Sequence, residues 1–340
     1  MLRNEREEGE LLISNTRRNS ESVSVVIVNY LSETLTARCI RSITQAEPAL
    51  AQELDFIIVD NGSKEDWPAL LEGLGSVSLI ECEKNLGFAE GANRGMRVGS
   101  GEYIFLINPD SLVCPGALSR AVAFMRDPAN SSVAILGPKV FDDPAKRSVQ
   151  FSARSFPGFA QALFGRYSLL TRLWPSNPWS RRYLKNDCQH DSPMRVDWVS
   201  GCCMLIRRKA LDEIGLFDEN YFMYVEDVDL CRRAWEAGWQ VAYFPGAEVT
   251  HQIGGSSKLR PIRMIVEHHR SMWIYYRKFF HHGPCARFVV LSVICARALL
   301  QVAGGSIQTL WKMLRGHSLS GGVTFSGVDS RDHPNSRNIR

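Results

Sequence analysis

Hydrophobic and polar positions follow two alternating periods along the first half of the chain. Short runs rich in β-branched residues end in polar or turn residues, which is typical of strands buried on both faces of a parallel sheet. Between them, apolar residues such as Leu35, Cys39 and Ile43 recur every four positions, which predicts amphipathic helices. The strands are expected at residues 22–30, 55–63, 77–83 and 102–111, and the helices at residues 31–46, 67–74 and 87–101. This alternation predicts an α/β fold with a mostly parallel sheet flanked by helices.

The second half of the chain repeats these patterns less regularly. Strand character returns at residues 196–208, a helix is expected at 209–215, and a longer helix is expected within 216–239. A last strand with a following turn is expected at residues 240–257. Residues 142–195 contain several Pro, aromatic and basic residues. They are interpreted as a long insertion that either forms a flap over a substrate or covers the sheet.

Polar side chains follow three of the predicted strands at the point where each strand ends. They are Asn29, Asp60, and the pair Asn108 and Asp110. Asn and Asp are also common turn residues, so any one of these positions is equally consistent with a simple turn. Because open parallel sheets bind ligands at the carboxyl ends of their strands, the recurrence favours a ligand site. A carboxylate such as Asp110 could hold Mg²⁺ or Mn²⁺ that also bridges phosphate groups.

A second candidate site lies at the start of the helix within residues 216–239. Glu226, Asp227 and Asp229 crowd its first turn, where acidic residues favour the helix dipole. That effect accounts for one or two carboxylates but not for the aromatic run before them, so Asp227 or Glu226 is a candidate general base. His251, at the end of a later strand, is either a metal or phosphate ligand or an ordinary structural histidine.

Several common sites are missing from the sequence. There is no GxxxxGK[ST] loop, no GxGxxG after the first strand and no GxSxG elbow, so P-loop, dinucleotide-binding and α/β-hydrolase functions are not supported. The nine cysteines show no CxxC or zinc spacing, which indicates free thiols in a reducing compartment. The N-terminus lacks the apolar core of a secretory signal. A cytoplasmic protein is therefore expected.

At this point the motifs match a known pattern. The chain resembles the family-2 glycosyltransferases of the GT-A (Rossmann-like) fold, most closely the bacterial rhamnosyltransferase-type branch that acts in polysaccharide assembly. The matching segments, in order, are VSVVIVNY, IIVDNGS, NLGFAEGANRGM, YIFLINPDS, VSGCCMLIRR, GLFDENYFMYVEDVDLCRRAWEAGW and THQIGGSS. They cover residues 22–257, and their order is far more specific than any one of them. The resemblance implies an enzyme that takes a sugar from a nucleotide diphosphate sugar and inverts its anomeric centre in one displacement.

The resemblance also implies roles for the residues at the strand ends. Asp60 would contact the nucleotide base, and Asn29 would lie near the nucleoside. The NPD segment stands where the family has its DxD motif, so Asp110 would bind the divalent metal ion, Mg²⁺ or Mn²⁺. Asn108 replaces the first Asp of that motif, which weakens metal binding and leaves Asn108 a hydrogen-bonding role, for instance with the ribose.

Three further roles follow from the same resemblance. Asp227 would be the base that deprotonates the acceptor hydroxyl, and Glu226 would orient Asp227 or the acceptor. His251 would complete the metal–diphosphate site. A positioned carboxylate base contributes about 10²–10⁴-fold to rate. A divalent cation directly stabilises the charge on a departing diphosphate.

The composition excludes some protein classes, and the charge distribution indicates contact with a membrane surface. The chain has 340 residues, 45% hydrophobic and 22% charged, which excludes a disordered, collagen-like or disulfide-scaffold protein. The net charge is +4, but residues 258–340 hold 13 Lys or Arg and 3 Asp or Glu, a net of +10. This basic segment includes the apolar run 286–305, which Arg297 interrupts. Helices on a membrane surface are favoured over a spanning helix or an ordinary packed subdomain.

The predicted organisation has four parts: a flexible leader (1–21), a GT-A domain (22–257), a basic and apolar helical extension (258–315) and a disordered tail (316–340). The predicted function is metal-dependent, inverting transfer of a sugar, expected to be L-rhamnose from dTDP-rhamnose. The expected acceptor is a lipid-linked or growing cell-surface oligosaccharide, reached by peripheral contact at the inner face of the cell membrane. No nucleic acid partner is expected, since no recognition motif accompanies the charge. The alternatives are a non-catalytic assembly protein on a degenerate transferase scaffold and a nucleotidyltransferase, which would need a basic Gly-rich loop near the first strand.

Overall fold

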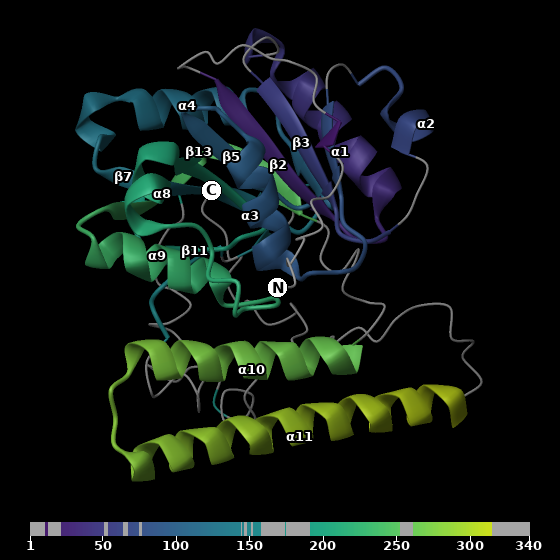
Figure 1. Ribbon diagram of the computed structural model, residues 1–340, viewed down its shortest axis with the longest axis vertical. Helices are drawn as coiled ribbons and strands as arrows, with labels where there is room; N and C mark the ends of the chain where they lie inside the picture. The colour runs from purple at the N-terminus through teal and green to yellow at the C-terminus, as the bar shows by residue number, and fades with distance from the viewer. Residues whose placement is uncertain are drawn as a thin grey trace, which may run out of the picture.

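The computed structural model describes most of the chain. The described residues are 11–12, 22–50, 54–63, 67–74, 77–143, 145, 148–150, 152–157, 174, 191–251 and 261–314. They form an α/β body with a pair of long helices beneath it (Figure 1). Most of the predicted insertion at residues 142–195, the turn at 252–257 and the predicted tail at 316–340 lie outside the described residues.

One half of the sheet is parallel. Its strands, in spatial order, are β4 (Val77–Glu81), β3 (Leu54–Asp60), β2 (Val23–Asn29) and β5 (Tyr103–Ile107). All seven residues of β2 are buried, which explains its run of β-branched residues. β2 and β3 pair in register along their whole length, ending with Asn29 opposite Asp60. The register therefore places these two polar side chains at the same edge of the sheet.

The other half of the sheet contains one reversed strand. β12 (Cys203–Arg207) runs antiparallel between β5 and β7 (Val133–Phe141), and β13 (Gln240–His251) is parallel to β7. Among the described strands of five or more residues, β12 alone runs against the common direction, so the predicted mostly parallel sheet is confirmed. The short strand β6 (Ser111–Val113) pairs antiparallel with the end of β13, with Ser111 opposite His251.

Five further short strands edge or accompany the sheet: β1 (Leu11–Leu12), β8 (Val149–Gln150), β9 (Ala153–Arg154), β10 (Met194–Arg195) and β11 (Trp198–Val199). β1 pairs with β4, and β1 itself lies in the segment 1–21 that is predicted to be a flexible leader. β8 pairs with β7, which places Gln150 near the end of β13. β9 and β11 form a separate two-stranded sheet.

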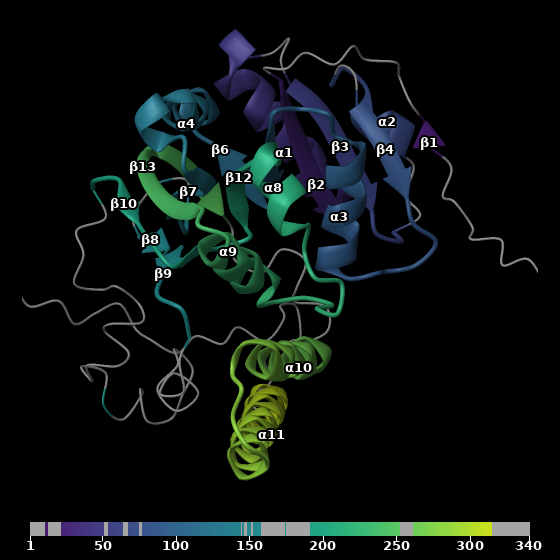
Figure 2. The same cartoon turned by 60° about the vertical axis from the view of Figure 1, so that its left-hand side comes forward.

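Helices cover both faces of the sheet (Figures 1 and 2). They are α1 (Glu33–Ala46), α2 (Trp67–Leu71), α3 (Phe88–Val98), α4 (Ala117–Arg126), α8 (Arg208–Ile214) and α9 (Glu226–Glu236), with 3₁₀ turns at Pro48–Leu50 and Pro128–Asn130. Successive residues of β2 point to opposite faces: Val25 packs in the cluster that contains α1 and α4 residues, whereas Val26 packs in the cluster of α3, α8 and α9. Two apolar cores therefore lie on either side of one sheet.

Two C-terminal helices form a separate layer. α10 (Pro261–Phe279) and α11 (Pro284–Leu314) run alongside each other below α9, as both ribbon views show (Figures 1 and 2). Tyr276 of α10 and Val290 and Ile294 of α11 form a small apolar cluster between them. Eight cysteines lie in the described part of the chain and all are free thiols, with Cys285 and Cys295 of α11 exposed.

Candidate functional site

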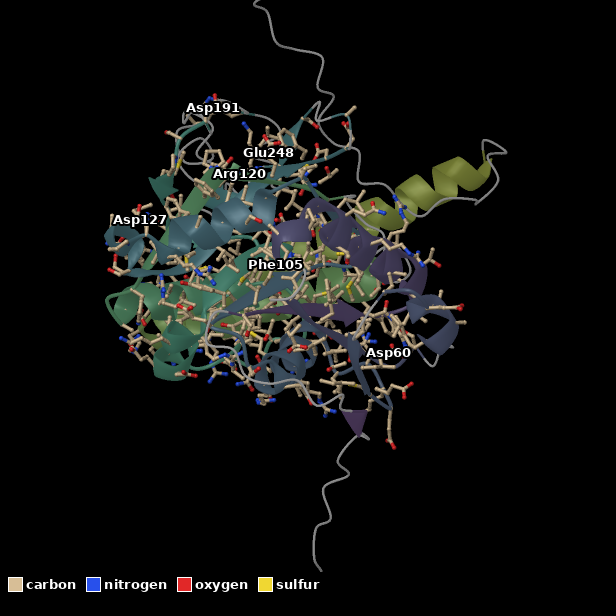
Figure 3. The ribbon with its side chains drawn as sticks, turned by 90° about the horizontal axis from the view of Figure 1, so that it is seen from above. Asp60, Phe105, Arg120, Asp127, Asp191 and Glu248 are labelled. Atoms are coloured by element: carbon tan, nitrogen blue, oxygen red, sulfur yellow. The ribbon has the colours of Figure 1, made fainter. Side chains whose placement is uncertain are left out.

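Asn29 and Asp60 form a buried polar cluster at the carboxyl end of the parallel strands. The Asn29 amide nitrogen lies 3.3 Å from Asp60 Oδ1 and donates to Ser63 Oγ at 2.9 Å, while Thr36 Oγ1 donates to Asn29 Oδ1 at 3.0 Å. Asp60 accepts from the Ser63 backbone N–H (3.0 Å) and from Trp67 Nε1 (3.0 Å). Asn29 therefore contacts both Asp60 and Ser63, which lies in the turn after Asp60. Figure 3 shows Asp60 in the N-terminal half of the sheet, away from Asp127 and Glu248. Contact of either residue with a nucleotide stays a prediction.

The predicted strand at residues 102–111 divides into β5 and β6, and the NPD segment is the turn between them. The Asn108 N–H donates to Cys202 O at 2.9 Å, and the Ser111 N–H donates to Asn108 O at 3.1 Å. The Asn108 side chain is half-buried, whereas only 8% of Asp110 is exposed. The turn thus aims a nearly buried carboxylate at the end of β13.

Asp110 and His251 meet where β6 pairs with β13. His251 Nε2 lies 3.1 Å from Asp110 Oδ1, although 141 positions separate the residues in the sequence. The Gln150 side-chain N–H₂ group donates to His251 O at 2.8 Å, so its amide oxygen faces the ring, 3.2 Å from Nδ1. Nδ1 is therefore the ring nitrogen that donates, and Nε2 of a neutral imidazole presents a lone pair to the carboxylate.

This arrangement fits a divalent cation. Two acceptor atoms facing each other at 3.1 Å repel unless a proton or a cation lies between them. A carboxylate oxygen and an imidazole nitrogen are together a suitable donor pair for a transition ion such as Mn²⁺, more than for Mg²⁺, which prefers oxygen ligands. No group of three or more His, Cys, Asp or Glu side chains gathers within the described residues. A cation held by Asp110 and His251 would therefore take its other ligands from substrate phosphates and water.

Glu226 and Asp227 are the first two residues of α9, which lies within the region 216–239 where a helix is predicted. Asp227 accepts two backbone hydrogen bonds, from Gly201 N–H to Oδ2 (2.8 Å) and from Val228 N–H to Oδ1 (2.8 Å). Glu226 is only 5% exposed, and its Oε2 has no hydrogen-bond partner. The third carboxylate of the turn, Asp229, is used internally: it accepts from Arg233 Nε at 2.7 Å and from Tyr221 OH at 3.1 Å.

The backbone before this pair is strained. Tyr224 (φ 69°) and Val225 (φ 70°) both adopt left-handed conformations. A β-branched residue such as Val rarely does so, and each such residue costs about 1–3 kcal/mol. The neighbouring loop is held tightly, since Phe88 N–H at the start of α3 donates to Phe222 O at 2.7 Å. Strain of this kind persists where the surrounding structure fixes the geometry, as it does around functional groups.

Burial perturbs the two adjacent carboxyls differently. Desolvation, and then the charge of Asp227, raises the pKa of Glu226 well above its usual range. Desolvation also raises the pKa of Asp227, but the Gly201 and Val228 N–H groups and the charge of Arg154 oppose that shift. Within the pair, Asp227 is therefore the carboxyl that ionises first, and Glu226 retains its proton to higher pH.

The loop before β12 connects the two halves of the site. Gly201 N–H binds Asp227, and the next carbonyl, Cys202 O, accepts from Asn108 N–H. Burial raises the pKa of the Cys202 thiol to about 11, and the charges of Asp227 and Asp110 both contribute to that rise. A single loop thus lies between the carboxylate pair and the NPD turn. The sequence patterns single out neither Gly201 nor Gln150 for a role, although Gly201 lies within a motif of the resemblance.

The comparisons with known proteins identify the family. The family described as "Glycosyltransferase like family 2" matches residues 20–273. The chain is 32% identical over 269 residues to the N-acetylglucosaminyl-diphospho-decaprenol L-rhamnosyltransferase of Mycobacterium tuberculosis, which covers 75% of this chain and 84% of that protein. It is 26% identical over 155 residues to the rhamnosyltransferase WbbL of Escherichia coli K12, covering 46% of this chain and 54% of WbbL.

Solved structures support the fold. The mannosyltransferase PcManGT from Pyrobaculum calidifontis, solved with GDP-Man and Mn²⁺, has a TM-score of 0.53 at 14% identity and covers 88% of this chain and 83% of its own. GalNAc-T7, solved with UDP, GalNAc and Mn²⁺, has a TM-score of 0.52 at 17% identity, covering 78% of this chain and 50% of its own. With the family match, these likenesses confirm the predicted fold and enzyme class. The chain belongs to glycosyltransferase family 2 and is a nucleotide-sugar glycosyltransferase with a GT-A fold.

Proposed function

We propose that the protein transfers L-rhamnose, with inversion, from dTDP-L-rhamnose to a sugar carried on a polyprenyl diphosphate. The mycobacterial relative, 32% identical over three-quarters of the chain, is named for rhamnosyl transfer to N-acetylglucosaminyl-diphospho-decaprenol. The observation that carries the proposal in this chain is the setting of Asp227. Its carboxylate is held by two backbone N–H groups at the start of α9, one of them from the loop that contacts the NPD turn.

In the proposed reaction Asp227 accepts the proton of the acceptor hydroxyl. Each of its oxygens uses one lone pair for a backbone N–H and keeps another for that proton. The acceptor oxygen then forms a bond to the anomeric carbon of the donor, and the bond from that carbon to the diphosphate oxygen breaks. One displacement of this kind inverts the anomeric centre.

The other residues bind and orient the substrates. Asp110 and His251 would hold a divalent cation, which when bound neutralises charge on the diphosphate leaving group. Glu226 has an unpartnered Oε2 and a raised pKa, so its protonated carboxyl is suited to donate a hydrogen bond to the acceptor. Asp60 would bind the base of the nucleotide, with Asn29 holding Asp60 in place. Asn108 would hydrogen-bond the donor, for instance at its ribose.

The proposed acceptor is bound to a membrane and the donor is a soluble nucleotide. We therefore also propose that the protein works at the inner face of the cell membrane. The basic region after residue 257 supports this placement, because basic and aromatic side chains suit anionic headgroups.

A donor screen followed by transfer tests the proposal. Thermal unfolding of the purified protein is measured with Mn²⁺ and a panel of nucleotide sugars, and dTDP-L-rhamnose is expected to raise the melting temperature most. A ligand at 100 times its Kd stabilises the folded state by about 2.7 kcal/mol. Transfer is then measured with polyprenyl-diphosphate N-acetylglucosamine as the acceptor. Nucleotide binding without transfer to this or any other acceptor would instead support the non-catalytic alternative.

A further inference from the structure

Exposed apolar side chains concentrate on the α10–α11 pair. Among the described residues, seven of the nine exposed large hydrophobic side chains lie on these two helices: Ile262, Val266, Phe288, Val289, Leu291, Leu299 and Leu300. Three of them, all on α11, are more than two-thirds exposed: Phe288 at 72%, Leu299 at 70% and Leu300 at 68%. Such a concentration of exposed apolar side chains marks an interaction site.

The composition of α11 points to lipid as the partner. Residues 284–314 contain no Asp or Glu, and their Lys and Arg residues are Arg287, Arg297 and Lys312. The stretch Pro284–Gly304 is long and apolar enough to cross a membrane: an 18-residue window within it has a mean hydropathy of 1.8, and only 11% of that window is buried. The core helix of a soluble protein with the same composition would be mostly buried. The apolar surface of α11 therefore remains uncovered by the described part of the protein.

The one charge in the middle of α11 faces inward. Arg297 Nη1 lies 4.0 Å from Met272 Sδ of α10. Desolvation, with the charge of Arg297 next, also lowers the pKa of His268 of α10 to about 3. Arg297 interrupts the apolar run in the sequence but therefore does not interrupt the outward surface of α11. The outward positions at helical spacing are Phe288, Ser292, Cys295 and Leu299, and all are exposed and uncharged.

α10 joins α11 to the loop that carries the proposed base. Ser271 Oγ donates to Met223 O at 2.9 Å, and His268 packs edge-on against Tyr224 with ring centroids 5.3 Å apart. At its other end, Lys278 Nζ lies 2.7 Å from both Asp218 Oδ2 and Asp229 Oδ2. Figure 2 views the pair nearly end-on, with α10 between the body and α11.

We propose that the outward face of α11 lies in the plane of an anionic lipid bilayer, with α10 as the spacer between the bilayer and the active site. Packed helices are about 8–10 Å apart, so the loop before Glu226 and Asp227 would stand one helix layer above the headgroups. Arg270 and Arg277 are exposed on α10 and supply charge for those headgroups, whereas Arg263 stacks over Phe222 of the body at 4.6 Å. α11 lies in the plane rather than across the bilayer because it packs along α10, which is tied to the body.

This inference rests on the proposed function only for the identity of the acceptor, since binding to lipid is measurable without any substrate. The purified full chain is floated with phosphatidylcholine vesicles, with and without phosphatidylglycerol. The wild-type protein is expected to float with vesicles, and more strongly when phosphatidylglycerol is present.

The test variant adds two charges to the outer surface, Leu299→Glu with Leu300→Glu. The control, Ala123→Glu with Ala129→Glu, adds the same two charges at exposed positions in and just after α4, on the far side of the body (Figure 1). The test variant should lose vesicle binding by at least about tenfold, since burying one Leu is worth about 1.5–3 kcal/mol, while the control should bind as wild type does. Both should keep the wild-type melting temperature without vesicles, because the substituted side chains are already exposed.

Three results would overturn the proposal. The first is a wild-type protein that does not float, and the second is a test variant that floats as well as wild type. The third is a dimer in solution that the test variant converts to a monomer without any vesicle binding, since the surface would then be a protein interface. Transfer to a short water-soluble acceptor reports on the proposed function separately. If neither this acceptor nor polyprenyl-diphosphate N-acetylglucosamine receives a sugar from any of the proteins, the proposed function is refuted and the flotation result still stands.

The orientation of α11 has its own measurement. Spin labels are placed at Phe288→Cys or Leu299→Cys, in a chain with Cys285→Ser and Cys295→Ser. In-plane insertion predicts the same depth for both labels, about 5–10 Å below the headgroup boundary. A helix that crosses the bilayer would separate their depths by about 16 Å, because the two positions are eleven residue steps apart and each step rises about 1.5 Å. That outcome would contradict in-plane insertion.

Discussion

The assignment of the base to Asp227 rather than Glu226 gives opposite predictions for two conservative variants. Asp227→Asn removes the proton-accepting group, and a carboxylate base contributes about 10²–10⁴-fold, so kcat/KM should fall by that factor. Both Asp227 oxygens accept backbone N–H groups. The amide of Asn must therefore turn its N–H₂ toward one of these donors, which should cost about 1–3 kcal/mol of stability as well.

Glu226→Gln should behave differently. Glu226 holds its proton to high pH, and a Gln side chain resembles that protonated form. We expect kcat/KM within about tenfold of wild type, since one altered hydrogen bond is worth about 1 kcal/mol. Initial rates of transfer, nucleotide binding by calorimetry and unfolding in denaturant are measured for both variants. Asp227→Asn with activity within tenfold of wild type, or Glu226→Gln with the larger loss of the two, would refute the assignment.

Four further predictions follow from the same geometry. EDTA should suppress transfer, and Mn²⁺ should restore it better than Mg²⁺. His251→Ala should weaken Mn²⁺ binding in the presence of nucleotide by about 10–100-fold, as measured by electron paramagnetic resonance. Metal-independent transfer would contradict the metal site. Glu226→Gln should flatten the pH dependence of the melting temperature: a raised folded-state pKa stabilises the protein fully below the unfolded pKa of this carboxyl, and that contribution is lost as pH rises toward the folded pKa. An unchanged pH profile would count against that burial effect. Gly87→Ala should cost about 2–4 kcal/mol in denaturant unfolding, because a Cβ there would clash with Phe222 O and the φ of 93° disfavours any side chain. Gly283→Ala, with open space around it, should cost little, and equal costs would contradict this reasoning. Lys278→Ala should lower the free energy of unfolding by about 1–2 kcal/mol, since it breaks a partly exposed ion pair with Asp229, a buried carboxylate of α9 that keeps other partners. An unchanged stability would argue against α10 as a support for the active site.

Much of the sheet could be predicted because burial on both faces leaves a plain signal. The fully buried β2 is a β-branched run, and its register with β3 brings Asn29 and Asp60 together as the strand ends suggested. β7 gave no such signal and no element was assigned to residues 112–141. Its interior carries Gly137 and Pro138, which are typical of a turn. Pro138 lies beside a register irregularity in β13, and a Cβ at Gly137 would lie 2.6 Å from Val199.

The sequence indicated candidate site residues, but not the contacts that hold them in place. The order of motifs indicated Asp110, Asp227 and His251, and the structure shows Asp110 and His251 in contact. The clamp of Gln150 on His251 depends on two strands far apart in sequence, so no local pattern reveals it. The left-handed Val225 is likewise invisible to local reasoning, because its residue type disfavours the conformation that the fold imposes.

The most direct test of the account is transfer itself, with the product analysed. Purified protein is incubated with dTDP-L-rhamnose, polyprenyl-diphosphate N-acetylglucosamine and Mn²⁺, and the lipid product is analysed by mass spectrometry and by NMR of the new anomeric centre. The account predicts the gain of one deoxyhexose with the anomeric configuration opposite to that of the donor, and product formation about 10²–10⁴-fold slower with Asp227→Asn. A product that retains the donor configuration, or the same yield from wild type and Asp227→Asn, would contradict it.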